Sequence, residues 1–299
     1  EICDVMSGKN IKVDKTKPAF KRRVNNERKR RIRFNLINGI NIKDMVGSTP
    51  NKDDKDLELN FTKVDIGKII PEIENFVMAG NLNGKIKFKQ KNNLIEPLAA
   101  ISIDELRVNN IPLGNLALNV TGNNEMNSFK VNSTLENENM ESFKLDGNLS
   151  YLNGENVMDM DLKLNKFNIG AFSTIGGEVI SNIRGLVSGN ANFQGSLSNP
   201  EMNGRLFLSK AGLTVPYLNV DYELEENAIV DLTERQFLLR NINLTDSKYK
   251  TKGVLFGNVR HSKLKDWKLD INVNTDYMVV LDTEESEDAY YYGKAFISG

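Results

Sequence analysis

The sequence predicts an all-β fold, an elongated antiparallel β-repeat that forms an open groove and carries short inserted helices. Two observations lead to this prediction. Apolar and polar residues alternate with a period of two over most of the chain after residue 57, and a pattern of glycines, prolines and strand residues occurs twice. The alternation gives each strand one apolar and one polar face, which is typical of half-buried antiparallel strands.

The duplication relates residues 61–163 to residues 164–266, and a partial third copy follows at 267–299. Each motif returns 103 to 105 residues later: Asp65-Ile-Gly67 as Asn168-Ile-Gly170, Gly80 as Gly185, Gly84 as Gly189, Phe88 as Phe193, Pro97 as Pro200, and Ile111-Pro-Leu113 as Val215-Pro-Tyr217. We interpret the glycines and prolines as turn residues. The chain is expected to be one elongated body and a piece of a longer array.

Alternation is clearest at 158–164 and 267–273, and shorter examples with turn clusters between them predict a meander of about twenty strands. The apolar sides of such strands must be covered by a second sheet, by a barrel or solenoid interior, or by an apolar ligand in a groove. The residues predicted to line the groove are Ile86, Phe88, Ile101, Ile103, Leu116, Leu118, Met158, Met160, Leu162, Leu164, Leu206, Leu208, Trp267, Leu269, Ile271 and Val273.

Two segments interrupt the alternation at equivalent places in the two copies. In 67–79 and 170–182 the apolar residues follow a three-to-four spacing, which predicts one short helix per repeat. The groove repeats are expected to fill 57–299. A polar linker at 47–56 separates them from a basic N-terminal strand or loop region at 1–46.

Charge is distributed unevenly along the chain. Residues 1–45 contain 13 Lys and Arg against 5 Asp and Glu, with the basic residues concentrated at 21–33. Such a segment is able to bind nucleic acid or anionic lipid headgroups, but no aromatic residues are interleaved with the charges. A solvated surface is therefore the favoured interpretation, and no nucleic-acid partner is predicted.

No catalytic, metal or cofactor motif is found, so the chain is predicted to be neither an enzyme nor a cofactor-binding protein. The single histidine, His261, has no cysteine or carboxylate cluster at metal-ligand spacing, and we expect it at the surface. Cys3 is the only cysteine, which excludes an internal disulfide. No run of about 18 apolar residues is present either.

Several spaced motifs resemble the repeat signature of the TamB family, the translocation and assembly module subunit with AsmA-like relatives. They cover about residues 61–299 and comprise the glycine-rich segment 185–208, Val215-Pro-Tyr217, Asp246-Ser247, the segment 253–261, and 291–296. The resemblance implies a periplasmic β-taco groove, in a protein that an N-terminal helix anchors in the inner membrane of a Gram-negative bacterium. It also implies an Omp85-type partner in the outer membrane, and roles in phospholipid transport and outer-membrane protein assembly.

The leading hypothesis is a non-enzymatic bridge that carries phospholipid along its groove. The main alternative is a scaffold or chaperone-like module that binds nascent outer-membrane β-barrel proteins by strand addition. A carbohydrate-binding or carbohydrate-degrading β-solenoid would need exposed aromatics and paired carboxylates on one face, and the sequence shows neither clearly.

Overall fold

The chain folds into a single long antiparallel β-sheet. The computed structural model describes residues 40–45, 55–69, 76–91, 94–122, 127–152, 154–177, 179–262, 268–285 and 292–299. Its strands are β1 (Ile40–Met45), β2 (Lys55–Asp65), β3 (Met78–Lys91), β4 (Leu94–Val108), β5 (Ile111–Gly122), β6 (Ser128–Asn137), β7 (Met140–Leu152), β8 (Glu155–Asn168), β9 (Ser181–Ser196), β10 (Glu201–Val215), β11 (Val220–Leu224), β12 (Ala228–Glu234), β13 (Gln236–Asp246), β14 (Lys252–Arg260), β15 (Lys268–Thr283) and β16 (Gly293–Ile297).

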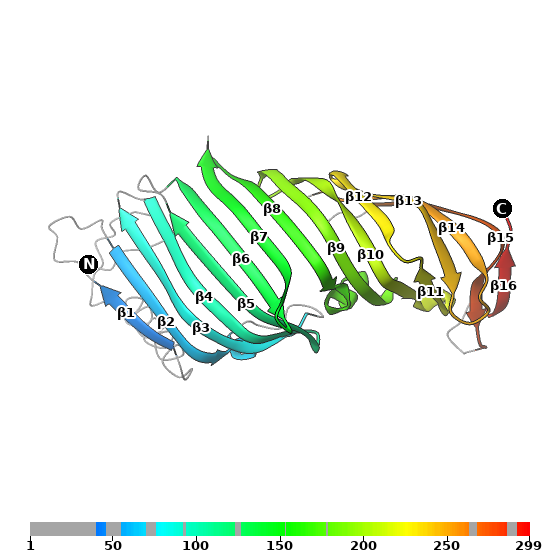
Figure 1. Ribbon diagram of the computed structural model, residues 1–299, viewed down its shortest axis with the longest axis horizontal. Helices are drawn as coiled ribbons and strands as arrows, with labels where there is room; N and C mark the ends of the chain where they lie inside the picture. The colour runs from blue at the N-terminus through cyan, green and yellow to red at the C-terminus, as the bar shows by residue number, and fades with distance from the viewer. Residues whose placement is uncertain are drawn as a thin grey trace, which may run out of the picture.

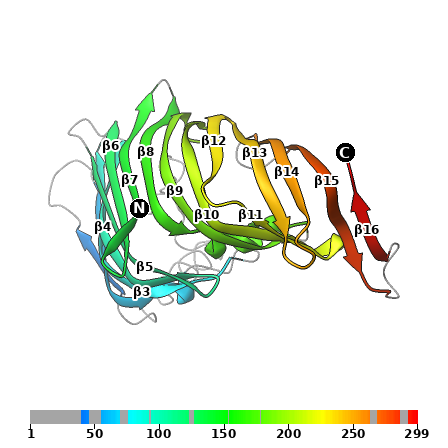
Figure 2. The same cartoon turned by 45° about the vertical axis from the view of Figure 1, so that its right-hand side comes forward.

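Neighbours in the chain are neighbours in the sheet, with one exception: β11 and β12 share a single position between β10 and β13. The sheet curves along its length, and β1 and β16 lie at its opposite ends (Figures 1 and 2). The all-β antiparallel prediction is thus confirmed. The described part of the chain has sixteen strands rather than about twenty, because many are longer than the alternation suggested.

Five strands are long because a β-bulge joins two alternating stretches into one strand. The bulge residues have positive φ angles between 50° and 54°, and the register shifts beside each of them: Lys63, Glu105, Lys166, Lys210 and Asn241. Each is the second of two polar residues between apolar ones, as in Ile103-Asp-Glu-Leu106. A bulge bends its strand and increases the local twist. The repeated bulges therefore curl one margin of the sheet, which we call the bulged margin.

At four of the bulges the backbone N–H of the bulge residue donates to a side chain on a neighbouring strand or turn. Lys63 N donates to Asn83 Oδ1 at 2.7 Å, Glu105 N to Asn115 Oδ1 at 2.9 Å, and Lys166 N to Ser188 Oγ at 2.9 Å. Lys210 N donates to Glu226 Oε2 at 3.2 Å. These bonds satisfy backbone groups that the bulge would otherwise leave unpaired.

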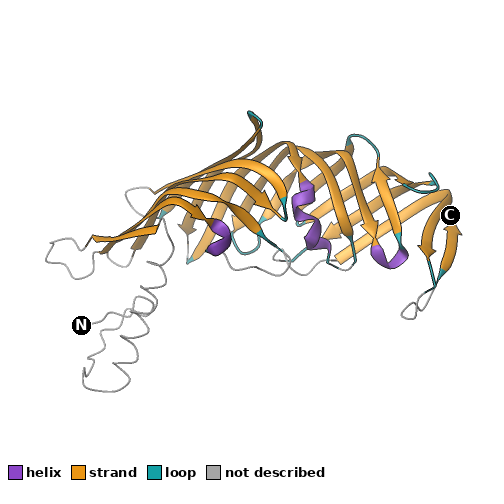
Figure 3. Cartoon of the chain, turned by 90° about the horizontal axis from the view of Figure 1, so that it is seen from below, coloured by secondary structure: helices purple, strands orange, loops and turns teal. Residues whose placement is uncertain are grey.

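Three short 3₁₀ helices follow strands that end at the bulged margin: η1 (Ile66–Lys68), η2 (Ile169–Gly176) and η3 (Pro216–Leu218) (Figure 3). The first two start alike, since Asp65 Oδ1 accepts from Gly67 N at 3.0 Å and Asn168 Oδ1 accepts from Gly170 N at 2.9 Å. The helices expected at 67–79 and 170–182 both run into the strand that follows them. In the first copy, residues 70–75 lie outside the described residues, and β3 has already begun at Met78. In the second copy, helix η2 ends before Gly177, and strand β9 has already begun at Ser181.

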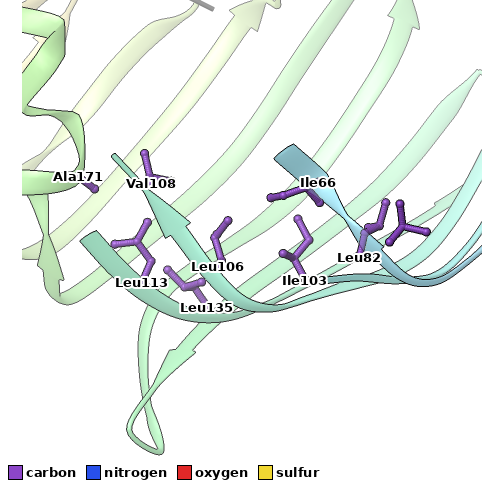
Figure 4. Packing of buried hydrophobic residues seen from close by; sticks show 9 residues of the cluster. Ile66, Leu82, Ile103, Leu106, Val108, Leu113, Leu135 and Ala171 are labelled. Carbon is purple, nitrogen blue, oxygen red and sulfur yellow. The ribbon is translucent and has the colours of Figure 1, made fainter. Parts of the chain in front are cut away.

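The helices close a dry core against the curled margin. Figure 4 shows nine residues of this cluster, to which β2 to β6, η1 and η2 contribute: Val64, Ile66, Leu82, Ile103, Leu106, Val108, Leu113, Leu135 and Ala171. An aromatic series crosses it, with ring centroids 5.9 Å apart for Phe76 and Phe172, 6.0 Å for Phe172 and Phe167, and 6.1 Å for Phe167 and Phe143. A second core near the C-terminal end gathers Val220, Tyr222, Ile242, Leu244, Met278 and Val279.

Several glycines that the sequence suggested as turn residues lie inside strands. Gly84 in β3 has a φ of 110° and Gly189 in β9 a φ of 142°. A Cβ atom would come within 2.1 Å of the Ala100 carbonyl oxygen at Gly84, and within 2.2 Å of the Arg205 carbonyl oxygen at Gly189. The interpretation as turns was wrong at these positions, because close approach of the neighbouring backbone, not chain reversal, requires glycine there.

The predicted boundaries near the N-terminus fall mostly outside the described residues. Of the basic region 1–46, the structure describes 40–45, which form β1 and pair with β2. Of the linker 47–56, the last two residues belong to β2.

Candidate functional site: an apolar trough

The strand registers build an apolar face from residues that lie directly opposite one another. One row, which we call the Ile101 row, crosses thirteen strands from β2 to β15: Phe61, Gly84, Ile101, Leu118, Ser133, Leu145, Leu162, Ala191, Gly204, Leu232, Phe237, Val259 and Leu269. Opposed residues of an antiparallel pair project to the same side of the sheet. The row therefore lies on one face.

A parallel row, the Ile103 row, contains no polar side chain: Val64, Leu82, Ile103, Leu116, Leu135, Phe143, Leu164, Gly189, Leu206, Val230, Leu239, Gly257 and Ile271. In the Ile101 row the one polar side chain is Ser133, whose hydroxyl donates to the Ala117 carbonyl at 3.0 Å. The face thus offers an apolar surface across the whole stretch from β2 to β15. We call it the trough face.

Fifteen of the sixteen residues predicted to line a groove belong to the trough face. The two rows contain Ile101, Ile103, Leu116, Leu118, Leu162, Leu164, Leu206, Leu269 and Ile271, and adjacent rows of the same face hold Ile86, Phe88, Met158, Met160, Leu208 and Val273. The sixteenth, Trp267, lies outside the described residues. That these side chains contact lipid stays a prediction.

Exposure changes across the trough face from one margin to the other. Near the bulged margin, Val64, Leu135 and Leu106 are almost fully buried in the dry core. Farther along the strands Ile86, Ile101 and Leu118 are only half-buried, and at the C-terminal end Leu269 is 58% and Ile271 40% exposed. All described strands belong to one sheet, so no second sheet within the described residues covers these side chains. This part of the face is an apolar surface with half-buried to exposed side chains.

The opposite face of the sheet is polar. A shallow hollow of about 530 Å³ on it is lined by side chains such as Lys144, Asp146, Asp161, Lys163 and Asn192. Asn192 Nδ2 donates to Asp161 Oδ1 at 2.9 Å and to Asp159 Oδ1 at 3.2 Å. The two faces therefore separate the chemistry of the sheet into a solvated side and an apolar side.

A hydrogen-bond network lies at the C-terminal core, and its donors satisfy the carboxylate of Asp246. Burial opposes ionisation of Asp246, but hydrogen bonds from the Thr251 hydroxyl and from the backbone N–H groups of Tyr249, Thr251 and Lys248 outweigh it and lower the pKa of this carboxyl. Burial, together with the negative charge of Asp246, raises the pKa of the Tyr222 phenol to about 12. The Tyr222 hydroxyl donates to the Val279 carbonyl at 2.9 Å. These contacts make the network structural.

His261 is not at the surface, contrary to the prediction. Its side chain is 5% exposed, and its ring lies 6.3 Å from that of Phe237. Burial and the nearby charge of Arg235 lower its pKa. The prediction was wrong because it judged His261 by the residues near it in sequence, whereas packing against Phe237 of β13 decides its environment.

Within the described residues, no group of three or more histidine, cysteine, aspartate or glutamate side chains is arranged to hold a metal ion. None of the described helices is long and apolar enough to cross a membrane.

In comparisons with known proteins, no family model, curated protein or solved structure matches this chain.

Sequence reasoning missed the bulges and the dry core that they create. The signal was present as pairs of polar residues between apolar ones, as in Leu164-Asn-Lys-Phe167 and Leu239-Arg-Asn-Ile242. Strict alternation would place the apolar residue that follows each polar pair, Phe167 or Ile242, on the polar face. The bulge returns it to the trough face, where Ile242 is fully buried.

Proposed function

We propose that the trough face binds the acyl chains of phospholipids and carries them along the sheet. The observation that supports this most directly is the Ile101 row, in which Ser133 is the one polar side chain from β2 to β15 and in which Ile101, Leu118 and Leu162 are only half-buried. Twelve strand-to-strand steps at about 4.8 Å give a path of about 60 Å. This exceeds the thickness of a bilayer, about 40–45 Å with headgroups.

The energetic benefit of such a surface is large. Exposing about 30 methylene groups of a two-tailed lipid to water costs about 0.8 kcal/mol for each, more than about 20 kcal/mol in total. Side chains that repeat every strand offer the acyl chains equivalent contacts at each step. Where the face is open, lipid would then move without a large barrier between neighbouring positions.

The proposal includes the setting that the resemblance to the TamB family implies. We place the protein in the periplasm of a Gram-negative bacterium, with an Omp85-type outer-membrane protein as partner and a supporting role in outer-membrane protein assembly. The half-exposed apolar rows support the lipid part of this proposal. The partner and the compartment rest on the resemblance alone.

The test is lipid binding to the purified chain. The protein is incubated with vesicles of phosphatidylethanolamine and phosphatidylglycerol, separated from them, and examined by native mass spectrometry. We expect bound phospholipid, and we expect Leu162→Asp and Ile271→Arg to lower its amount because each places a charge in an apolar row.

The matched controls are Lys163→Asp and Asn272→Arg, which place the same charges on the polar face of the same strands. They should keep the lipid. Circular dichroism establishes that all four variants are folded. A lipid-free wild-type protein, or equal loss of lipid from the control variants, would overturn the proposal.

A second candidate function, strand addition, is favoured by the free edge of β15. Residues 268–274 of this strand pair with β14, and no described strand pairs with their other side. A photo-crosslinker at Leu269 should then capture an unfolded outer-membrane β-barrel polypeptide, whereas one at Leu118 should capture lipid. Capture of the polypeptide equally at both positions would argue against pairing at this edge.

A further inference from the structure

The trough face is not uniformly open along its length. From β2 to β5 the residues of the Ile101 row and of the adjacent row through Ile86 are half-buried. In the middle of the sheet, the same two rows contain side chains that are almost completely buried: Met160 at 3%, Ala191 at 5%, Met202 at 2% and Leu232 at 5% exposure. Farther on, Val259 is half-buried and Leu269 is exposed.

Side chains of the trough face itself produce this central burial. Phe193 lies between Met160 and Met202 in register, and it packs against the cluster of Ala191, Met202 and Leu232. Phe237 packs against the same cluster from β13. Thioether and aromatic groups attract each other, and the flexible methionines fill the space beside the rings.

The small residues Gly204 and Ala191 leave space for larger side chains to pack beside them. Gly204 and Ala191 are adjacent in the Ile101 row, and a Cβ atom at Gly204 would come within 2.6 Å of the Ala191 Cα. Glycine at this position therefore lets the β9 and β10 backbones lie close together beneath the cluster. An acyl chain that enters here has to displace the half-buried rings of Phe193 or Phe237 to reach the buried cluster beneath them, whereas Ile101 and Leu118 are themselves half-buried.

We infer that Phe193 and Phe237, with Met202 between them, form a constriction that divides the trough into two lipid-binding segments and limits passage from one to the other. The inference rests on the proposed lipid function and adds to it the residues that control movement. On the N-terminal side the segment is floored by Ile86, Ile101 and Leu118. On the C-terminal side it is floored by Val259, Leu269 and Ile271.

The test maps lipid positions along the trough. The purified chain is loaded with a phosphatidylcholine that carries a diazirine near the end of one acyl chain, irradiated, digested and analysed by mass spectrometry. We expect crosslinks on peptides that contain Ile101, Leu118 and Ile271. The yield on the peptide of Met202 should be at least about tenfold lower, because a packed cluster excludes the chain.

Phe193→Ala and Phe237→Ala are the test variants, and either one is sufficient if the other fails to fold. Each should raise the yield at Met202 to about that at Ile101. Each should also speed the transfer of the lipid from one vesicle population to another. The matched control is Phe207→Ala, an aromatic truncation on the polar face of β10, 37% exposed, which should change neither measurement.

The outcomes separate the two proposals. Wild-type crosslinks at Met202 as abundant as those at Ile101 would overturn the constriction and leave lipid binding intact. Absence of crosslinks along the whole chain would overturn the proposed function itself. Loss of crosslinks at Ile271 in the Phe193→Ala variant would also contradict the constriction, since removal of a barrier cannot empty the far segment.

Discussion

The two copies of the repeat share a backbone and differ in what their side chains do with it. Both have a bulged lysine, Lys63 and Lys166, followed by a residue that caps a 3₁₀ helix. Both have a glycine inside the following strand where the neighbouring backbone comes close. Yet Phe88 lies opposite Pro97 in the first copy, whereas its counterpart Phe193 lies opposite the buried Met202 in the second.

We infer from this difference that the repeated glycines, bulges and caps determine the curvature of the sheet. The size of the inward side chains determines how exposed the trough face is. The sequence matched Pro97 with Pro200, but the registers place Met202 at the position of Pro97. Glycine, bulge and cap positions are fixed by backbone geometry, so they recur. The inward side chains only have to be apolar, so the residues opposite Phe88 and Phe193 are free to differ.

The largest expected effect concerns the shared glycines. Gly84→Val and Gly189→Val should each lower the free energy of unfolding by about 3 kcal/mol or more, because each combines a left-handed φ with a collision against a neighbouring carbonyl. Urea denaturation followed by circular dichroism measures the change. Lys85→Val and Asn190→Val, at exposed neighbouring positions, should cost much less. A large loss in only one copy would contradict the shared backbone role.

A smaller effect, on the stability of the fold at low pH, should distinguish the two copies. Despite partial burial, Asp221 has its pKa lowered to about 2 by Arg184, whose two nitrogens donate at 2.8 and 2.7 Å, and by the hydroxyls of Ser247 and Thr214. Since the pKa is depressed on folding from 3.8, this stabilisation is complete above pH 3.8 and is lost as the pH falls through 3.8 toward about 2.

The contribution of Asp221 is about 1 to 2 kcal/mol once screening at this partly exposed pair is considered. Urea denaturation between pH 5 and pH 2 should show a shallower pH dependence for Asp221→Asn than for the wild-type protein. In the first copy, Ala79 stands 105 residues before Arg184 and provides no such pair. An unchanged pH dependence in Asp221→Asn would mean that the ion pair contributes nothing to stability.

The helix caps should behave alike in the two copies. Asp65→Ala and Asn168→Ala each remove the side-chain oxygen that accepts a backbone N–H, and each should cost about 1 kcal/mol. Thermal unfolding compares them with Thr62→Ala and Lys163→Ala, exposed positions in the preceding strands. If Asn168→Ala were neutral while Asp65→Ala was not, the longer η2 would not depend on its cap.

The smallest expected effect is at the bulges. Asn83→Ala and Ser188→Ala remove the acceptors of the Lys63 and Lys166 N–H groups, and water is able to replace them at these exposed sites. We expect each to cost about 0.5 kcal/mol in urea denaturation. Hydrogen exchange of the two bulge amides provides the sharper measurement, since each should become faster in its own variant and stay unchanged in the other.

Much of the fold could be predicted because period-two alternation is a local property. The residues 158–164 identified their strand and its apolar face directly, and the structure places Met158, Met160, Leu162 and Leu164 on the trough face. The bulges were harder to predict, because two polar residues between apolar ones also suit a turn. His261 could not be placed, since its burial comes from Phe237, 24 positions away in sequence.

The sequence by itself determined that the chain is a meander of antiparallel strands with one apolar side, because the alternation and the repeated motifs are written along the chain. Only the tertiary structure decided where that side is sealed and where it is open. Burial depends on which side chains meet across neighbouring strands. The register that brings Phe193 beside Met202, and the bulge that turns Ile242 inward, arise only when the strands are assembled into a sheet.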